Sequence, residues 1–157
     1  MRQKSVFLFS ILLTGAFSQA ALAQNFLPVN AQPAAVIYEE GIKLMRDERY
    51  GEAARKFEKV IKLESANAQA HNALSAVYVH LNRRDEAYSS FQKAVRLAPD
   101  FANAYYNLGN LYDRDGRAEL AADCFRQAVE RKPDYALAWI ALGNVSLGLK
   151  NVENKQN

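Results

Sequence analysis

The sequence predicts an all-α solenoid, in which pairs of helices joined by short turns stack one after another. The chain of 157 residues matches itself when it is shifted by 34 positions, and a fixed period of this length is typical of solenoid proteins. Within each period the apolar residues recur at helical spacing. Glycine (7) and proline (4) are scarce, and 50% of the residues are hydrophobic. This composition disfavours turn-rich β architectures and disordered chains.

The first 23 residues have the organisation of a secretory signal peptide. Arg2 and Lys4 precede an apolar run over residues 6–17, and small residues then form an A-x-A cleavage site. Cleavage is expected after Ala23, or alternatively after Ala20. A retained membrane anchor is the other alternative, but a membrane span needs about 20 apolar residues, and this run has only about a dozen. We therefore expect the mature chain in a periplasm or outside the cell, with no stable membrane span.

The mature chain is expected to be nearly neutral. The formal net charge is +3, but removal of Arg2 and Lys4 leaves 18 basic against 17 acidic side chains. A neutral chain gives no reason to expect nucleic acid as a partner. Residues 24–33 are polar and punctuated by proline, so they are interpreted as a linker. A single cysteine excludes a disulfide framework within the chain and any multi-cysteine metal site.

The rest of the chain is a repeat domain of three full units and a half unit. Phe57, Phe91 and Phe125 occupy one position of the 34-residue period, with an alanine four residues before each. The domain spans residues 34–150, with units at 34–67, 68–101 and 102–135 and a half unit at 136–149, before a polar tail at 151–157.

Each full unit is expected to contain two helices. The first helix of the third unit carries an apolar stripe at i, i+3, i+4 and i+7, formed by Tyr105, Leu108, Gly109 and Tyr112. On the second helix, Phe125 is expected to fill the space that Gly109 leaves. Gly116 lies between them, and glycine suits the left-handed conformation that ends a helix. Its equivalents are Asn82, which tolerates that conformation, and Glu48, which fits it poorly.

These residues resemble the tetratricopeptide repeat family. The family pattern of aromatic, Leu, Gly and Tyr, followed by Ala, Phe and Pro, is matched across the third unit if Tyr105 stands for the aromatic residue. The second unit departs from it with His71 and Ser75, and the first unit departs further, with Glu40 in the leucine position. The resemblance covers residues 34 to about 149. It implies a non-catalytic protein-interaction module, and it names no partner.

The sequence offers no arrangement of catalytic or metal-ligating residues, and no cofactor is predicted. His71 and His80 are nine residues apart on one expected helix, so they point about 180° apart and cannot share a metal ion. His71 occupies a packing position and is expected to be a hydrogen-bonded structural residue. Cys124 lies beside Phe125 and is expected to be a small, partly buried hydrophobe. An intermolecular disulfide is the alternative for this cysteine in an oxidising compartment.

The candidate binding site lies on the first helices, on the face about 130° from the packing stripe. Its candidate peptide-binding residues are Tyr38, Asn72, Asn103, Tyr106, Asn107, Asn110 and Asn144. Amide side chains both donate and accept hydrogen bonds, so they could bond the backbone of a peptide whatever its sequence. This face is similar to the asparagine-lined groove of some peptide-binding family members. The alternative is solvation, because Asn107 and Asn110 are residues common at these family positions.

One binding mode of the family is not expected. Members that grip a chaperone's C-terminal carboxylate carry paired lysines, an arginine and asparagines in the groove. Here those positions hold Tyr38, Ile42, Ala73, Asn103 and Asn107, with no lysine among them. The charge-assisted capture of a carboxylate is therefore missing.

The half unit lacks a second helix to cover its first. Trp139, Leu142 and Val145 are expected to find some cover on the preceding helix. An exposed apolar surface is expected at Ile140, Leu147 and Leu149, and such surfaces mark interfaces. It would dock a second copy, giving a homodimer, or a helix of a partner; a plain cap is the alternative. The sequence thus predicts an exported adaptor or scaffold that binds a partner protein in envelope assembly or secretion, with a self-associating structural module as the alternative.

Overall fold

The computed structural model describes residues 32–156, so the predicted signal peptide and most of the predicted linker lie outside the described residues. Residues 32–156 form seven α-helices and no strand, which confirms the all-α prediction. The helices are α2 (Ala34–Arg46), α3 (Tyr50–Leu63), α4 (Ala68–His80), α5 (Arg84–Leu97), α6 (Ala102–Arg114), α7 (Ala118–Arg131) and α8 (Ala136–Gln156). Two helices lie in each of the three predicted units.

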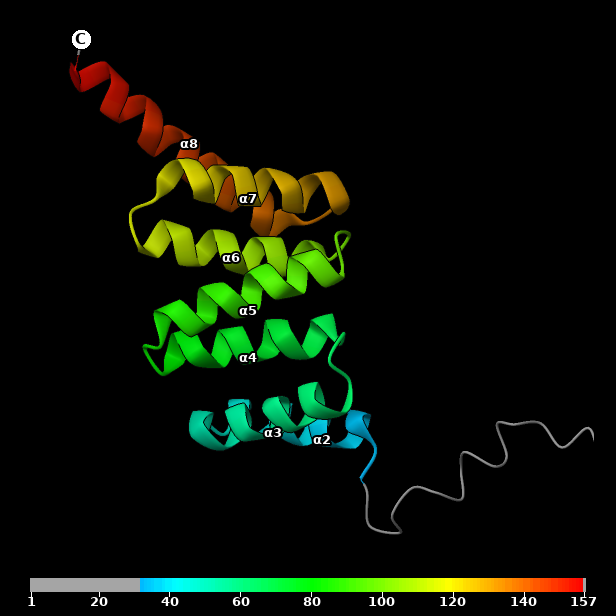
Figure 1. Ribbon diagram of the computed structural model, residues 1–157. Coiled ribbons are helices and arrows are strands. Elements are labelled where there is room, and N and C mark those ends of the chain that lie inside the picture. The colour runs from blue at the N-terminus through cyan, green and yellow to red at the C-terminus, as the bar shows by residue number, and fades with distance from the viewer. Residues whose placement is uncertain (1–31, 157) are drawn as a thin grey trace, which may run out of the picture. The chain divides into compact units, whose positions relative to one another are not determined.

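The helices pack in chain order (Figure 1). The closest pairs are α2 with α3, α4 with α5, and α6 with α7, and each second helix also packs on the first helix that follows it. The first helices contact one another as well, α2 with α4, α4 with α6 and α6 with α8. Their outward faces therefore form one continuous surface, as a stacked solenoid requires.

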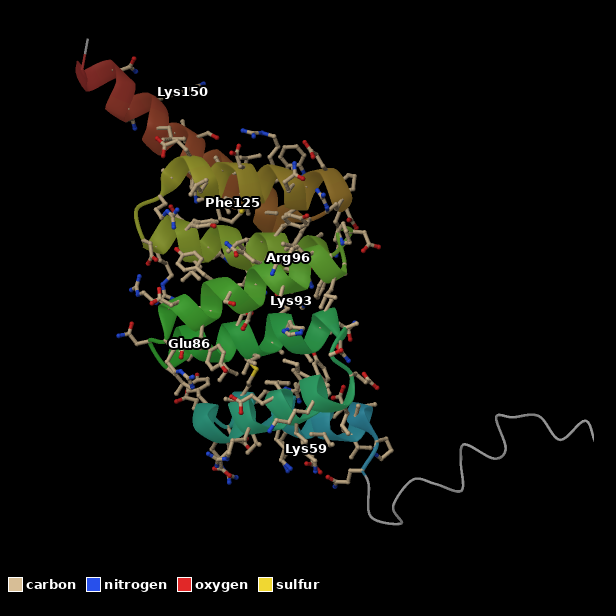
Figure 2. The ribbon with its side chains drawn as sticks, viewed as in Figure 1. Lys59, Glu86, Lys93, Arg96, Phe125 and Lys150 are labelled. Atoms are coloured by element: carbon tan, nitrogen blue, oxygen red, sulfur yellow. The ribbon has the colours of Figure 1, made fainter. Side chains whose placement is uncertain are left out.

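A phenylalanine from each second helix fills the space between the two helices of its unit. Phe57, Phe91 and Phe125 are all buried, and Figure 2 shows Phe125 between α6 and α7. A Cβ atom added to Gly41 would lie 2.7 Å from the Phe57 ring, and one added to Gly109 would lie 2.6 Å from the Phe125 ring. The predicted close approach is confirmed. Burial of each ring stabilises the fold by about 1.5–3 kcal/mol.

The turn inside each unit uses one residue in the left-handed conformation. The φ angles are 57° at Glu48, 57° at Asn82 and 71° at Gly116, as the sequence predicted for this position. The next residue then donates its backbone N–H to a carbonyl five residues back, which closes the first helix. The three bonds are Arg49 to Leu44 at 2.9 Å, Arg83 to Tyr78 at 2.8 Å and Arg117 to Tyr112 at 2.9 Å.

Ring nitrogens on two first helices hold the loop that precedes their unit. The His71 Nε2 atom lies 3.1 Å from the Ser65 carbonyl oxygen. At the equivalent position, Trp139 Nε1 donates to the Pro133 carbonyl at 2.9 Å. The prediction that His71 is a hydrogen-bonded structural residue is confirmed.

The last helix is longer than the sequence predicted. The half-unit helix was expected to end near residue 149, but α8 continues to Gln156, into the predicted polar tail. Figure 1 shows this end of α8 extending past α7, and Lys150 marks it in Figure 2. Gly148 is the last glycine of the sequence, and no proline follows it. Nothing in this segment therefore interrupts the helix as the turn residues do between paired helices.

The cover over α8 is only partly as predicted. Val145 is buried and Leu142 is half-buried against α7, as expected. Trp139, for which some cover was expected, is 52% exposed. Its indole N–H donates to a carbonyl of the preceding loop. Among residues 32–156, no helix combines the length and the apolar character needed to cross a membrane.

Candidate functional site

A hollow of about 240 Å³ lies between α4 and α6, on the face that the sequence predicted to bind a peptide. Asn107 and Asn110 reach it from α6, where their spacing of three places both on one side of the helix. Ala76 holds the position in α4 that Asn110 holds in α6, and its small side chain leaves the space open. The lining residues are Ala76, Val79, His80, Phe91, Asn107, Asn110, Leu111 and Arg114.

Two of the predicted amides bond to each other across the unit boundary. Asn107 Nδ2 donates to Asn72 Oδ1 at 3.1 Å. The bond connects α6 to α4 beside the hollow, and both side chains are half-buried. An asparagine amide can make more bonds than this one, so the oxygen of Asn107 and the amino group of Asn72 retain capacity for a ligand. The pair therefore presents a fixed acceptor and a fixed donor.

Tyr106 does not line the hollow, although the sequence placed it among the groove residues. Its ring packs 5.1 Å from the Tyr135 ring and 5.8 Å from the Phe125 ring, measured between centroids. These contacts make it a packing residue at the junction of the third unit and the half unit. The helical register was right, but the neighbouring aromatic rings draw the side chain into the packing.

Tyr38 lies apart from the central hollow. It is half-buried, with its ring centroid 5.4 Å from that of Phe57. It lines a separate hollow of about 210 Å³, with Asn67 and Gln69 among its other walls. Burial, helped by the negative charge of Glu39, raises the pKa of the Tyr38 phenol. The hydroxyl therefore stays protonated at neutral pH and can donate a hydrogen bond.

The remaining predicted groove residues stand outside both hollows. Asn103 and Asn144 are exposed on α6 and α8. Near Asn144, α8 presents an apolar stripe in which Leu137 is 57%, Ile140 59% and Leu147 63% exposed. Leu149 was predicted to join this stripe, but it is half-buried against Val145 and its neighbours. It lies four residues after Val145, on the same side of the helix.

Among the polar residues of the central hollow, sequence reasoning missed His80 and Arg114. They share one position of the period, one residue beyond the last groove position of α4 and α6. The His80 ring stacks on Tyr50, with centroids 4.3 Å apart and planes 6° apart. Arg114 adds a positive charge at the rim. The recurrence of nitrogen donors at one register position was the signal that could have found them.

Neither metal binding nor thiol chemistry is evident in the described residues. No three His, Cys, Asp or Glu side chains within residues 32–156 are placed to hold a metal ion. Cys124 is half-buried beside the apolar core, as predicted. Burial, with a smaller contribution from the charge of Asp123, raises the pKa of its thiol to about 11. The thiol is therefore protonated at neutral pH and is a poor nucleophile.

Comparison with known proteins agrees with this geometry. Residues 67–134 match the family model described as tetratricopeptide repeat. No curated protein sequence matches the chain. The tetratricopeptide domain of Arabidopsis OM64 superposes with a TM-score of 0.70 at 23% identity, covering 73% of this chain and 95% of that one.

Two further solved structures have the same arrangement of helices. The first such domain of Spaghetti (RPAP3), bound to the HSP90 peptide SRMEEVD, gives a TM-score of 0.71 at 24% identity and covers 78% of this chain and 97% of that one. MamA from Desulfovibrio magneticus RS-1 gives 0.67 at 27% identity, covering 78% of this chain and 69% of that one.

The family match and the structural neighbours lead to one conclusion. The family model covers the two best-preserved units, and the neighbours share the helical stack on either side of them. This fold is a protein–protein interaction module, and one neighbour is solved with a bound peptide. Residues 67–134 are tetratricopeptide repeats, and the described chain as a whole has the fold of such proteins.

Proposed function

We propose that this protein is an exported adaptor that binds a peptide segment of a partner protein between α4 and α6, in envelope assembly or secretion. The observation that carries the proposal is the central hollow, where the amides of Asn107 and Asn110 face the apolar side chains of Ala76 and Val79. Amides satisfy a peptide backbone, and apolar walls take its side chains. Export is proposed from the basic, apolar and A-x-A order of the first 23 residues.

The chemistry of the hollow indicates what the segment would look like. The fixed Asn72–Asn107 pair supports recognition of backbone groups. Leu111 supports an apolar side chain, and Arg114 supports an acidic one at the rim. The absence of lysine at Tyr38 and Asn103 argues against capture of a terminal carboxylate in the manner of some family members. The segment would therefore be internal, apolar and flanked by an acidic residue.

Peptide selection followed by substitution tests this proposal. Peptides selected from a random phage-displayed library on the intact chain would be measured by calorimetry against the Asn107→Ala, Asn110→Ala double variant. Loss of two hydrogen bonds, each worth about 0.5–1.5 kcal/mol, should weaken binding roughly five- to a hundred-fold. Tyr106 is left unchanged because it packs against Phe125 and Tyr135.

Gln92→Ala is the matched control, because it removes an exposed amide from α5 outside the hollow. It should leave the affinity unchanged. Peptides that bind the folded double variant as tightly as the original chain would contradict the proposal. They would show that the asparagines only face water.

Self-association is the second candidate function, favoured by the exposed stripe of Leu137, Ile140 and Leu147 on α8. Two copies could cover these side chains across a two-fold axis. Light scattering after size exclusion should then show a dimer at micromolar concentration. The Ile140→Glu, Leu147→Glu variant should be a folded monomer. A chain that is monomeric at every concentration would remove this candidate.

A further inference from the structure

The first helix of each unit has four equivalent packing positions. In the second unit these are His71, Leu74, Ser75 and Tyr78, and in the third they are Tyr105, Leu108, Gly109 and Tyr112. All eight are buried or half-buried. In α8 the same positions are Trp139, Leu142, Gly143 and Ser146, and here Trp139 and Gly143 are exposed. Among residues 32–156, no helix covers Trp139 and Gly143 as their equivalents in the other units are covered.

The glycine position shows what is missing. A Cβ atom added to Gly41 would lie 2.7 Å from the Phe57 ring. A Cβ atom added to Gly109 would lie 2.6 Å from the Phe125 ring. A Cβ built on Gly143 meets nothing within 4 Å. The half unit thus keeps the residue that admits a phenylalanine ring, but no ring from the described part of the chain occupies the position.

The chain itself shows which kind of helix this face accepts. Each second helix presents an alanine, a phenylalanine four residues later, and a small apolar residue three further on. The three sets are Ala53, Phe57 and Val60; Ala87, Phe91 and Ala94; and Ala121, Phe125 and Ala128. Each of these nine side chains is at most 1% exposed. The matching ligand is therefore an amphipathic helix with this Ala, Phe and Ala or Val spacing.

We propose that α8 binds such a helix from a partner protein, whose phenylalanine enters the open position over Gly143 and completes the fourth unit. This face is distinct from the groove, because Gly143 lies about 100° around the helix from the predicted groove residue Asn144. Within residues 32–156, a folded second copy offers none of the ring-bearing second helices, since Phe57, Phe91 and Phe125 are buried. The other phenylalanine of the described residues, Phe101, is the N-cap of α6.

A peptide taken from α7 provides the probe. It has the sequence Ala118–Arg131 with Cys124→Ser, and it is added to the intact chain. Trp139 is the only tryptophan of the chain and is 52% exposed beside Gly143. Docking should shift its emission to shorter wavelength in a saturable way. The same peptide with Phe125→Ala should bind at least tenfold more weakly.

Two glycine variants of the intact chain locate the binding. Gly143→Leu fills the open position and should weaken the peptide at least tenfold. Gly148→Leu is the matched control, because this glycine lies on α8 and also has open space around it. It should leave binding unchanged. Ser146→Arg, which obstructs the same face, should reproduce the loss if Gly143→Leu does not fold.

Each remaining outcome overturns the proposal. The absence of a saturable emission change would show that the face does not take this helix. Equal losses in Gly143→Leu and Gly148→Leu would place the peptide elsewhere. A dimer without peptide that Gly143→Leu abolishes would show that a second copy, with exchanged helices, occupies the position.

Discussion

Gly109 and Gly143 occupy the same position of the period, but replacing them by alanine should have opposite effects on stability. Gly109→Ala would place a methyl group 2.6 Å from the Phe125 ring, and such overpacking costs about 1–3 kcal/mol. Gly143→Ala meets open space, and replacing a glycine inside a helix by alanine stabilises by about 0.5–1 kcal/mol. Urea unfolding should therefore show changes of opposite sign. Stabilisation in both variants would contradict the close packing of α6 on α7.

Cys124 should be almost inert toward alkylation in the folded chain. Burial raises the pKa of its thiol from 9.0 to about 11, which lowers the thiolate fraction at pH 8 by about a hundredfold. Iodoacetamide labelling followed by mass spectrometry should be slower in buffer than in urea by about that factor. The urea sample is the control, because unfolding exposes the thiol. Equal rates in the two samples would show that the thiol is accessible in the folded state.

At the scale of elements, the turns inside the three units have the same backbone conformation, but the residue at the left-handed position makes them differ in strain. Glu48 has a φ of 57°, and the left-handed conformation costs a residue with a side chain about 1–2 kcal/mol. Glu48→Gly should raise the free energy of unfolding by about 0.5–1 kcal/mol, since the flexibility of glycine offsets part of the gain. Asn82→Gly should gain less, because asparagine tolerates this conformation.

Gly116→Ala is the reverse experiment on the third turn, where φ is 71°. It should lower the free energy of unfolding by about 1 kcal/mol, because alanine has no polar side chain to support this conformation. Thermal and urea unfolding of the three turn variants would be compared together. A loss in Glu48→Gly would show that the Glu48 side chain stabilises its turn.

The paired helices were predictable because their signals are local and repeated. The buried Phe125 recurs as a phenylalanine in the other two units. Gly116 is replaced in the second unit by Asn82, which adopts the same left-handed conformation. The end of α8 was not predictable in this way, because residues 149–156 contain no turn signal like those between the paired helices. For Trp139, helical register predicted the position on α8 but could not give the exposed fraction of the side chain, which is 52%.

The candidate site was predictable in its face but not in its side-chain partners. Helical spacing placed Asn107 and Asn110 on the side of α6 where the hollow lies. It could not show that Asn107 bonds Asn72, or that Tyr106 packs on Tyr135. Those contacts depend on the distance between neighbouring units and on which aromatic side chains lie at their boundary. Periodicity within one helix carries no information about these distances.

For the molecule as a whole, export is the prediction that decides where a partner should be sought. The basic, apolar and A-x-A order predicts removal of the first 23 residues, or of the first 20 at the alternative site. Intact-mass measurement of the protein from its own host should give a terminus at Gln24 or Ala21. A mature species that still begins at Met1 would contradict both export by cleavage and the proposed envelope role.

The contacts between helices are confined to near neighbours in the chain, as Figure 1 shows for the stack from α2 to α8. Opening of one end therefore need not disturb the other, and folding can begin in any unit and spread along the array. Amide hydrogen exchange should reflect this: protection should be greatest in α4 and α5 and should fall toward both ends. The stretch of α8 that extends past α7 should exchange first, and a bound partner helix would slow it.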